Sequence, residues 1–337
     1  MSSRRQLAKL LRQLQQVLAA WWILCGLSHS VTAEDRVTFR SASAGARISQ
    51  FGTVVDYTGR ELILQSRDRT DVRRMPSDDV LEISTNYLPA HADGRQRLAA
   101  GEPAAARELL ERALEEESRD WVRREILALL VQCALATGDQ ITAGERFLQI
   151  TNSDPETLYF SLAPLCWSES PVSPALAARG LTWLQSKKEI PRLLGASVLL
   201  YRRPFDEQAQ TTLRDLASSG NPVLQRHAQL QLWRLRVGKP EVDSQELGRW
   251  ERLLDDLPRA ARTGAFTLIA AGYEKVGDPA HALACYLRAG LDSAGQRTLA
   301  RAALEAALRI ARETADRRSE AVIATELQTR FAASVIP

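Results

Sequence analysis

Two stretches of this 337-residue chain, GEPAAARELLERAL (residues 101–114) and GDPAHALACYLRAG (residues 277–290), share one layout. Each begins with glycine, which tolerates the left-handed backbone that often ends a helix. Proline follows two positions later, where it suits the first turn of a new helix. Alanine then recurs at a spacing of seven residues, at Ala106, Ala113, Ala282 and Ala289. The layout predicts pairs of helices joined by tight turns, with alanines where neighbouring helices approach closely.

The frame extends beyond these two stretches. Small residues precede the two glycines by seven positions, at Gly94 and Ala270. A third copy, residues 136–150, has glycine, aspartate and alanine in the same frame but ends on isoleucine. Asp278 is a good N-cap for the helix that follows it, whereas Glu102 is a poorer one.

This frame resembles the tetratricopeptide repeat, a family that prefers bulky side chains at positions filled here by Phe266, Tyr273 and Tyr286. The resemblance covers about a third of the chain. Residues 221–235 also resemble HEAT-type hairpins. Both resemblances imply helical hairpins stacked into a solenoid, whose curved inner face is free to accept a ligand.

Apolar residues at helical spacing predict further helices. Their expected ranges are 119–136, 155–167, 174–186, 191–202, 205–219, 222–235, 294–315 and 317–333, after a short connection at 87–93. We therefore expect a mainly α protein, an α-solenoid of roughly six or seven hairpins over residues 87–337 that is tetratricopeptide-like and partly HEAT-like.

Residues 34–86 have a different composition pattern, with short runs of Val, Ile, Thr, Tyr and Phe interrupted by Gly, Asp and Ser. The runs predict five short strands, with turns at Thr58–Gly59 and at Met75–Asp78. The pattern resembles small Sm-like or Src-homology-3-like β-barrels, which often bind RNA or peptides. Basic side chains in this module alternate with acidic ones, which favours a solvated strand face over a nucleic-acid site.

The N-terminus reads as an export signal. Residues 1–33 hold four basic residues and no acidic one, and eleven apolar residues at 17–27 are too few to span a bilayer comfortably. We expect cleavage after Ala33, although an uncleaved membrane anchor and a buried first helix remain alternatives. Cleavage would change the formal net charge from +3 to −1 by removing those four cations, so net charge does not favour a nucleic-acid or membrane partner.

Catalytic and metal-binding motifs are absent from the sequence. His91, His227 and His281 have no partner at metal-ligand spacing, and no phosphate loop, dinucleotide fingerprint or G-x-S-x-G motif occurs. Three cysteines remain after the predicted cleavage, which is an odd number with wide spacing: Cys133, Cys166 and Cys285. We therefore predict no catalytic residue, cofactor or metal.

Tryptophan offers the clearest candidates for a contact surface. Five of these residues follow the predicted cleavage point: Trp121, Trp167, Trp183, Trp233 and Trp250. At helical spacing such side chains more often pack between helices than anchor a ligand. Trp121 with its neighbours Arg123 and Arg124 is the candidate partner-binding site that we select.

The leading hypothesis is an exported, non-enzymatic scaffold of the bacterial cell envelope that binds other proteins and no nucleic acid. The plan is similar to secreted repeat proteins of Gram-negative-type bacteria, including planctomycetes. One alternative is an envelope glycan-binding protein or hydrolase with a site between barrel and solenoid, which would need convergent polar groups in a deep pocket. Burial of Asp56, Asp78 or Asp79 together in a cleft would favour it. Another is a membrane-tethered assembly factor.

Overall fold

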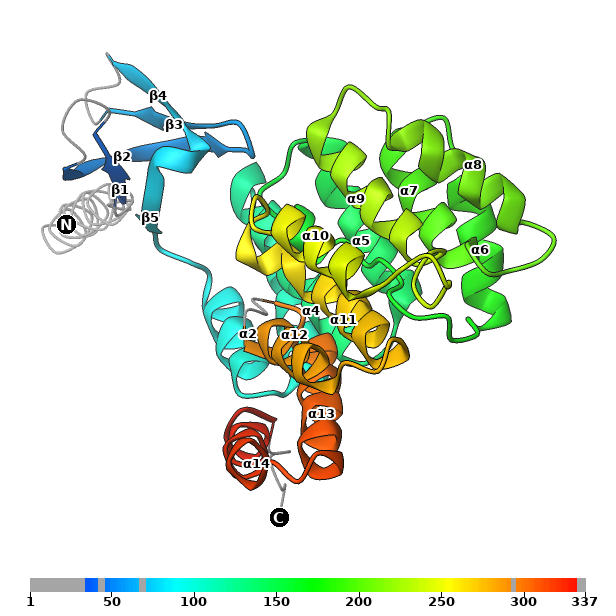
Figure 1. Ribbon diagram of the computed structural model, residues 1–337. Helices are drawn as coiled ribbons and strands as arrows, with labels where there is room; N and C mark the ends of the chain where they lie inside the picture. Colours follow the sequence, from blue (N-terminus) through cyan, green and yellow to red (C-terminus); the bar gives the residue numbers. More distant parts are fainter. Residues whose placement is uncertain (1–33, 42–45, 67–70, 292–294, 332–337) are drawn as a thin grey trace, which may run out of the picture.

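The computed structural model describes residues 34–41, 46–66, 71–291 and 295–331. Within those ranges a small five-stranded antiparallel sheet comes first and thirteen α-helices follow (Figure 1). The mainly α character predicted from the sequence is confirmed. The predicted export segment and its cleavage point lie outside the described residues. In the described part of the chain, no helix is both long enough and apolar enough to cross a membrane.

The sheet has the strand order β4-β3-β2-β1-β5. Its strands are β1 Asp35–Arg40, β2 Arg47–Tyr57, β3 Glu61–Gln65, β4 Val72–Pro76 and β5 Val80–Ser84. The long β2 pairs with β1 through its first half and with β3 through its second half. Alternate side chains form a small buried face: Val37, Phe39, Val54, Leu62, Leu64 and Met75. The five predicted strands are confirmed, and the second predicted turn is a 3-10 turn, η1 Ser77–Asp79.

The turn between β2 and β3 attaches the sheet to the helices. Thr58 N donates to Glu61 O at 3.0 Å, which confirms the predicted hairpin turn. Gly59 does not adopt a positive φ. A β-carbon at Gly59 would lie 1.7 Å from Glu156 O, and Gly59 N donates to Asp154 Oδ2 at 2.9 Å. Glycine is required here because the backbone at residue 156 approaches so closely.

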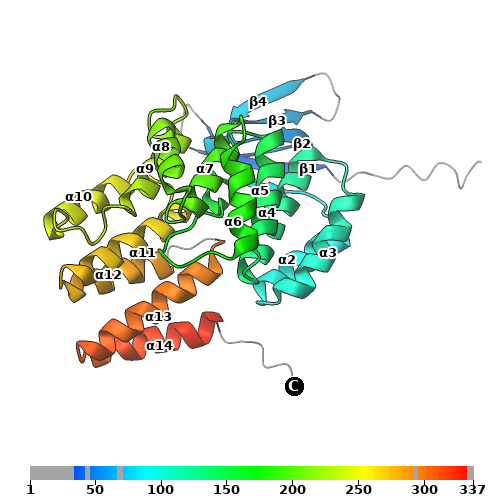
Figure 2. The same ribbon diagram turned by 90° about the vertical axis from the view of Figure 1, so that its right-hand side faces the viewer.

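The helices of the described chain follow one another with short connections. They are α2 Pro89–Ala99, α3 Pro103–Glu116, α4 Asp120–Ala136, α5 Gln140–Ser153, α6 Pro174–Leu184, α7 Glu189–Leu199, α8 Asp206–Leu216, α9 Pro222–Trp233, α10 Ser244–Leu254, α11 Arg259–Lys275, α12 Pro279–Leu291, α13 Arg297–Glu313 and α14 Arg317–Phe331. Most consecutive helices pack side by side (Figure 2).

The alanine frame has the structural role that its spacing predicts. Gly101 and Gly277 adopt φ angles of 83° and 77° directly after α2 and α11. The four frame alanines are fully buried: Ala106, Ala113, Ala282 and Ala289. Asp278 Oδ1 accepts a hydrogen bond from His281 N at 3.2 Å, as expected of an N-cap, whereas the Glu102 side chain makes no cap. The α2–α3 and α11–α12 pairs are therefore close-packed helical hairpins.

Two of the elements predicted from the sequence are wrong. The expected connection at 87–93 is already helical from Pro89, because proline starts a helix readily at its first position. The helix expected over 155–167 does not form, and only the 3-10 turn η2 Phe160–Leu162 interrupts an irregular path. We call residues 157–173, between α5 and α6, the inner strap.

The C-terminal part of the helical array packs against the N-terminal part. Helix α13 packs against α4, and Thr298 Oγ1 donates to Leu135 O at 3.2 Å (Figure 1). Gln296 Nε2 donates to Ser161 O on the inner strap at 2.5 Å. These contacts join parts of the chain that are more than a hundred residues apart, so the inner strap lies between the two halves of the helical array.

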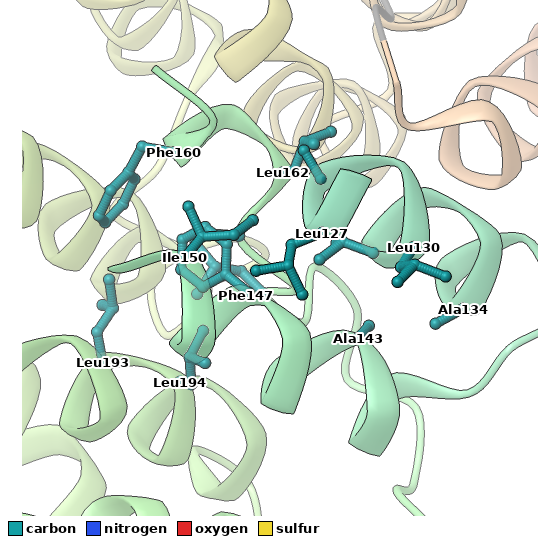
Figure 3. Close-up of a cluster of buried hydrophobic side chains, with 14 of the residues drawn as sticks. Leu127, Leu130, Ala134, Ala143, Phe147, Ile150, Phe160, Leu162, Leu193 and Leu194 are labelled. Carbon is teal, nitrogen blue, oxygen red and sulfur yellow. The ribbon is translucent and has the colours of Figure 1, made fainter. Parts of the chain in front are cut away.

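Two clusters of buried apolar side chains form the core, one running from Val37 to Ala228 and the other from Leu230 to Ile323. Trp167 of the inner strap packs against both. Figure 3 shows part of the first cluster, where side chains from α4, α5, α7 and the inner strap gather: Leu127, Leu130, Phe147, Ile150, Phe160, Leu162, Leu193 and Leu194. The inner strap is thus part of the core, although it has no regular structure.

Candidate functional site

The three predicted partner-binding residues are engaged inside the protein. Trp121 is 3% exposed and Arg124 is 4% exposed, so the expectation that they are accessible is wrong. Arg124 Nη2 pairs with the Asp56 carboxylate and donates to Tyr57 O at 3.1 Å. Arg123 Nη1 donates to Glu117 O at 2.8 Å. Arg124 is therefore bonded to the sheet, and Arg123 is bonded to the C-terminal end of α3 and the connection that follows it.

The three carboxylates whose joint burial would favour the hydrolase alternative are not buried together. Asp56 forms its ion pair with Arg124, Asp78 is exposed, and Asp79 is half-buried in η1. In the described part of the chain, no group of three or more His, Cys, Asp or Glu side chains is placed to hold a metal ion. Cys133, Cys166 and Cys285 are free thiols.

Two of the histidines are buried for packing. His91 is fully buried beside Tyr87, with ring centroids 4.4 Å apart. Both of its ring nitrogens lack a hydrogen bond, and burial lowers the pKa of His91 to about 4. His227 lies against Phe160 of the inner strap at a centroid distance of 4.8 Å, and burial lowers its pKa too. His281 is exposed and contacts Asp278 at 2.8 Å.

A large cavity lies between the two halves of the helical array. Its volume is about 1280 Å³. Its walls come from the α4–α5 turn, the inner strap, the C-terminal ends of α7 and α9, one face of α11 and the first three turns of α13. We call it the central cavity. It is somewhat larger than the 300–1,000 Å³, roughly, of common small-molecule sites.

Apolar groups dominate the walls of the central cavity. The apolar lining includes Leu135, Ile141, Leu165, Val172, Leu176, Val198, Leu268, Leu299, Ala302, Ala303 and Ala306. Several polar side chains in the wall are already bonded within the protein. Tyr201 Oη donates to Arg234 O at 2.5 Å, and the Gln296 and Thr298 side chains donate to backbone carbonyls. The cavity therefore offers a guest molecule mostly apolar contact.

The inner strap is fitted closely to its surroundings. A β-carbon on Gly264 of α11 would lie 2.0 Å from Trp167 Cε2, so the indole rests directly on the helix backbone. Cys166 N donates to Ser197 Oγ of α7 at 2.8 Å. Burial raises the pKa of the Cys166 thiol, so this residue behaves as a neutral wall group. Outside η2, these contacts take the place of helical hydrogen bonds in holding the strap.

Arg234, at the C-terminal end of α9, is the most unusual polar group in the wall. It is 4% exposed and lines the cavity. Its Nη1 donates to Ser197 O at 2.9 Å and to Gln231 Oε1 at 2.7 Å, and its Nη2 donates to Ser168 O at 2.7 Å. Its Nε has no hydrogen-bond partner. Burial lowers the pKa of Arg234, although an arginine remains charged at neutral pH.

The cavity wall has more cations than anions. Among the described residues, Arg234 has no carboxylate within ion-pair distance. Glu169, on the inner strap, pairs instead with Lys275 Nζ at 3.7 Å. Asp139 caps α5 by accepting from Thr142 N, and exposed Arg202 adds a further positive charge to the wall.

Sequence reasoning did not select this cavity. Trp167 was among the five tryptophans considered, and it is the one that lines the cavity, whereas Trp121, Trp183, Trp233 and Trp250 are buried between elements. Arg234 has no local signal, because its neighbours in the chain do not reveal that α7 and the strap will surround it. A proline-flanked stretch between α5 and α6 was the only hint of irregular structure.

Comparison of the chain with protein-family models, with curated protein sequences and with solved structures found no match.

Proposed function

We propose that this chain is an exported, non-enzymatic binding protein of the bacterial cell envelope, and that the central cavity is its ligand site. The observation that carries the proposal is the cavity itself, whose apolar walls come from both halves of the chain. Large apolar pockets with a few polar groups are the usual form of a binding site. Its size and composition suit a mainly apolar ligand.

The proposal extends to the architecture. We propose that the sheet is a small barrel of the Sm-like or Src-homology-3-like kind, and that the helices form a tetratricopeptide-like solenoid. The sharing of β2 between β1 and β3 supports the first, because a long bent strand allows a small sheet to curve. The repeated glycine and alanine frame of α2–α3 and α11–α12 supports the second.

Blocking the cavity tests the ligand site. Ala302 lines the cavity on α13 and is exposed, so Ala302→Trp places a large ring in the cavity without overpacking the core. An apolar dye that fluoresces in non-aqueous surroundings should bind the parent chain saturably and bind this variant at least about tenfold more weakly. Ala105→Trp, at an exposed alanine of α3 that does not line the cavity, is the matched control.

Equal dye binding by the two tryptophan variants would contradict the ligand-site proposal. Turnover of envelope glycans or esters by the purified parent chain would favour the hydrolase alternative instead. Mass spectrometry of the native N-terminus tests export, for which we expect a mature chain that begins at Glu34.

Protein binding, the role expected from the sequence, has a second candidate surface. Phe51 and Val55 of β2 and Val72 of the edge strand β4 are each more than half exposed. Phe51, Thr53 and Val55 alternate along β2 and share one face of the sheet. Thr53 pairs with Gln65 and Gln65 pairs with Val72, so Val72 lies on that same face, opposite the buried side. Exposed apolar patches of this kind mark protein–protein contacts, and an edge strand can accept a strand from a partner.

The combined change Phe51→Ser and Val55→Thr tests that surface. Cross-linking in envelope extract should lose one specific protein with this variant and keep it with Val322→Thr, which alters a similarly exposed apolar residue on α14. Retention of every cross-linked protein by both variants would remove the sheet face as a docking surface.

A further inference from the structure

The geometry points to a long-chain carboxylic acid as the ligand of the central cavity, with its carboxylate on Arg234 and its acyl chain along the apolar walls. This inference rests on the proposed ligand site and specifies the chemical class that the site takes. It depends on two features of the wall, namely an incompletely bonded buried cation and a lining in which apolar surface predominates.

The cation is built into the wall rather than placed on a surface. A guanidinium carries five N–H donors. Ser197 O and Gln231 Oε1 occupy the two donors of Arg234 Nη1, and Ser168 O occupies one donor of Nη2. The Nε donor and the second Nη2 donor have no acceptor in the described part of the chain. One edge of a guanidinium, formed by Nε–H and one Nη2 N–H, matches the two oxygens of a carboxylate.

Burial of this charge creates a need for a counter-ion. An ionised side chain that is removed from water without a charged partner is costly, and only part of the cost is offset by the carbonyl oxygens around Arg234. Glu169 acts on Arg234 only through space and forms no ion pair with it, because its exposed carboxylate contacts Lys275 at 3.7 Å. A ligand carboxylate beside Arg234 would supply a counter-charge for the guanidinium and an acceptor for an unbonded N–H group.

The rest of the wall favours an acyl chain over a peptide. Each peptide unit brings one N–H and one C=O that need partners when they leave water. The Tyr201, Gln296 and Thr298 side chains already donate to backbone carbonyls, so they have few free groups to offer. An acyl chain needs no hydrogen bonds, and the leucine, valine and alanine side chains of the wall supply the contact that it gains from.

The position of the acid group is fixed by neighbouring residues. Tyr201 stacks near the guanidinium, with Arg234 Cζ 5.2 Å from the centroid of its ring. Arg202 follows Tyr201 directly in the chain and also lines the cavity. The two arginines and the tyrosine thus form one basic area at the ends of α7 and α9, whereas three alanines of the wall belong to α13: Ala302, Ala303 and Ala306.

Displacement of the apolar dye from the full chain tests the inference with dodecanoate, dodecanol and dodecylammonium as probes. The three share one alkyl chain and differ in the charge of the head group. We expect dodecanoate to bind the parent at least roughly tenfold more tightly than dodecanol, and dodecylammonium to bind most weakly. Arg234→Gln should bring the acid and the alcohol to equal affinity. Arg236→Gln, at a half-exposed arginine outside the cavity wall, should leave the preference intact.

The comparison of probes on the parent chain does not depend on whether Arg234→Gln folds. Equal binding of dodecanoate and dodecanol by the parent would overturn the inference, and Ala302→Trp would still show whether the cavity binds apolar molecules. An apolar peptide that displaces the dye more effectively than dodecanoate would overturn the acyl-chain class. If both tryptophan variants keep full dye binding, the ligand site on which the inference rests is removed.

Discussion

The α11–α12 hairpin and the inner strap are held by different kinds of contact. In the hairpin, Gly277 makes the turn, Asp278 caps α12 three residues before His281, and Ala282 lets the two helices touch. In the strap, Phe160 packs on Phe147 of α5 and on His227 of α9, and Trp167 lies on α11. The hairpin is built from neighbours in the chain, whereas the strap takes its path from partners that are far away.

That difference shows why a cavity can exist in this molecule. A helix in place of the strap would satisfy its own backbone and fill the space between the halves with a cylinder of side chains. The backbone and side-chain groups of the irregular strap instead contact α7, α9, α11 and α13. It lines one side of the central cavity and leaves the volume open.

Loss of the Phe160 ring should have the largest effect on stability. Phe160→Ala removes a ring that is 7% exposed and meets Phe147 at a centroid distance of 5.6 Å. We expect the free energy of unfolding to fall by about 3–5 kcal/mol in urea denaturation. Leu158→Ala, at a 39% exposed position of the same strap, is the control and should cost much less. Similar small losses for both would mean that the strap is not part of the core.

Overpacking of the hairpin should have an intermediate effect. Ala282 is fully buried where α12 meets its neighbours, so Ala282→Leu should lower the free energy of unfolding by roughly 1–3 kcal/mol. Ala280→Leu places the same side chain at an exposed position of the same helix and should be nearly neutral. If urea melts of Ala282→Leu match those of the parent, the alanine frame does not set the helix spacing.

The smallest effect near neutral pH concerns His227 beneath the strap. Burial holds its pKa below the ordinary value of about 6.5, so the unfolded chain binds a proton more readily than the folded chain does. The associated stability is present above that ordinary pKa and is lost as pH falls toward the folded value. Urea melts from pH 7.5 to 5 should show a decline that is smaller in His227→Gln. An identical decline in the variant would assign the pH dependence to other groups, such as His91.

The candidate site could be predicted only in outline. A solenoid-like array implies an inner face that is free to bind, and that expectation led to Trp121, Arg123 and Arg124. Trp121 proved to be buried, Arg124 pairs with Asp56 of the sheet, and Arg123 donates to backbone carbonyls at the end of α3. Leu135 and Thr298, which both line the central cavity, are more than a hundred positions apart, so no local pattern joins them.

The sequence by itself determined the hairpins, most of the helix ranges and the five strands. Those features depend on glycine φ, capping, alternation and helical spacing, all of which act over a few residues. Only the tertiary structure decided that residues 157–173 form a strap, that α13 returns to α4, and that Arg234 becomes a buried cation in a cavity wall. The physical reason is that these outcomes depend on which distant surfaces supply partners for backbone and charged groups, and composition along the chain does not encode that pairing locally.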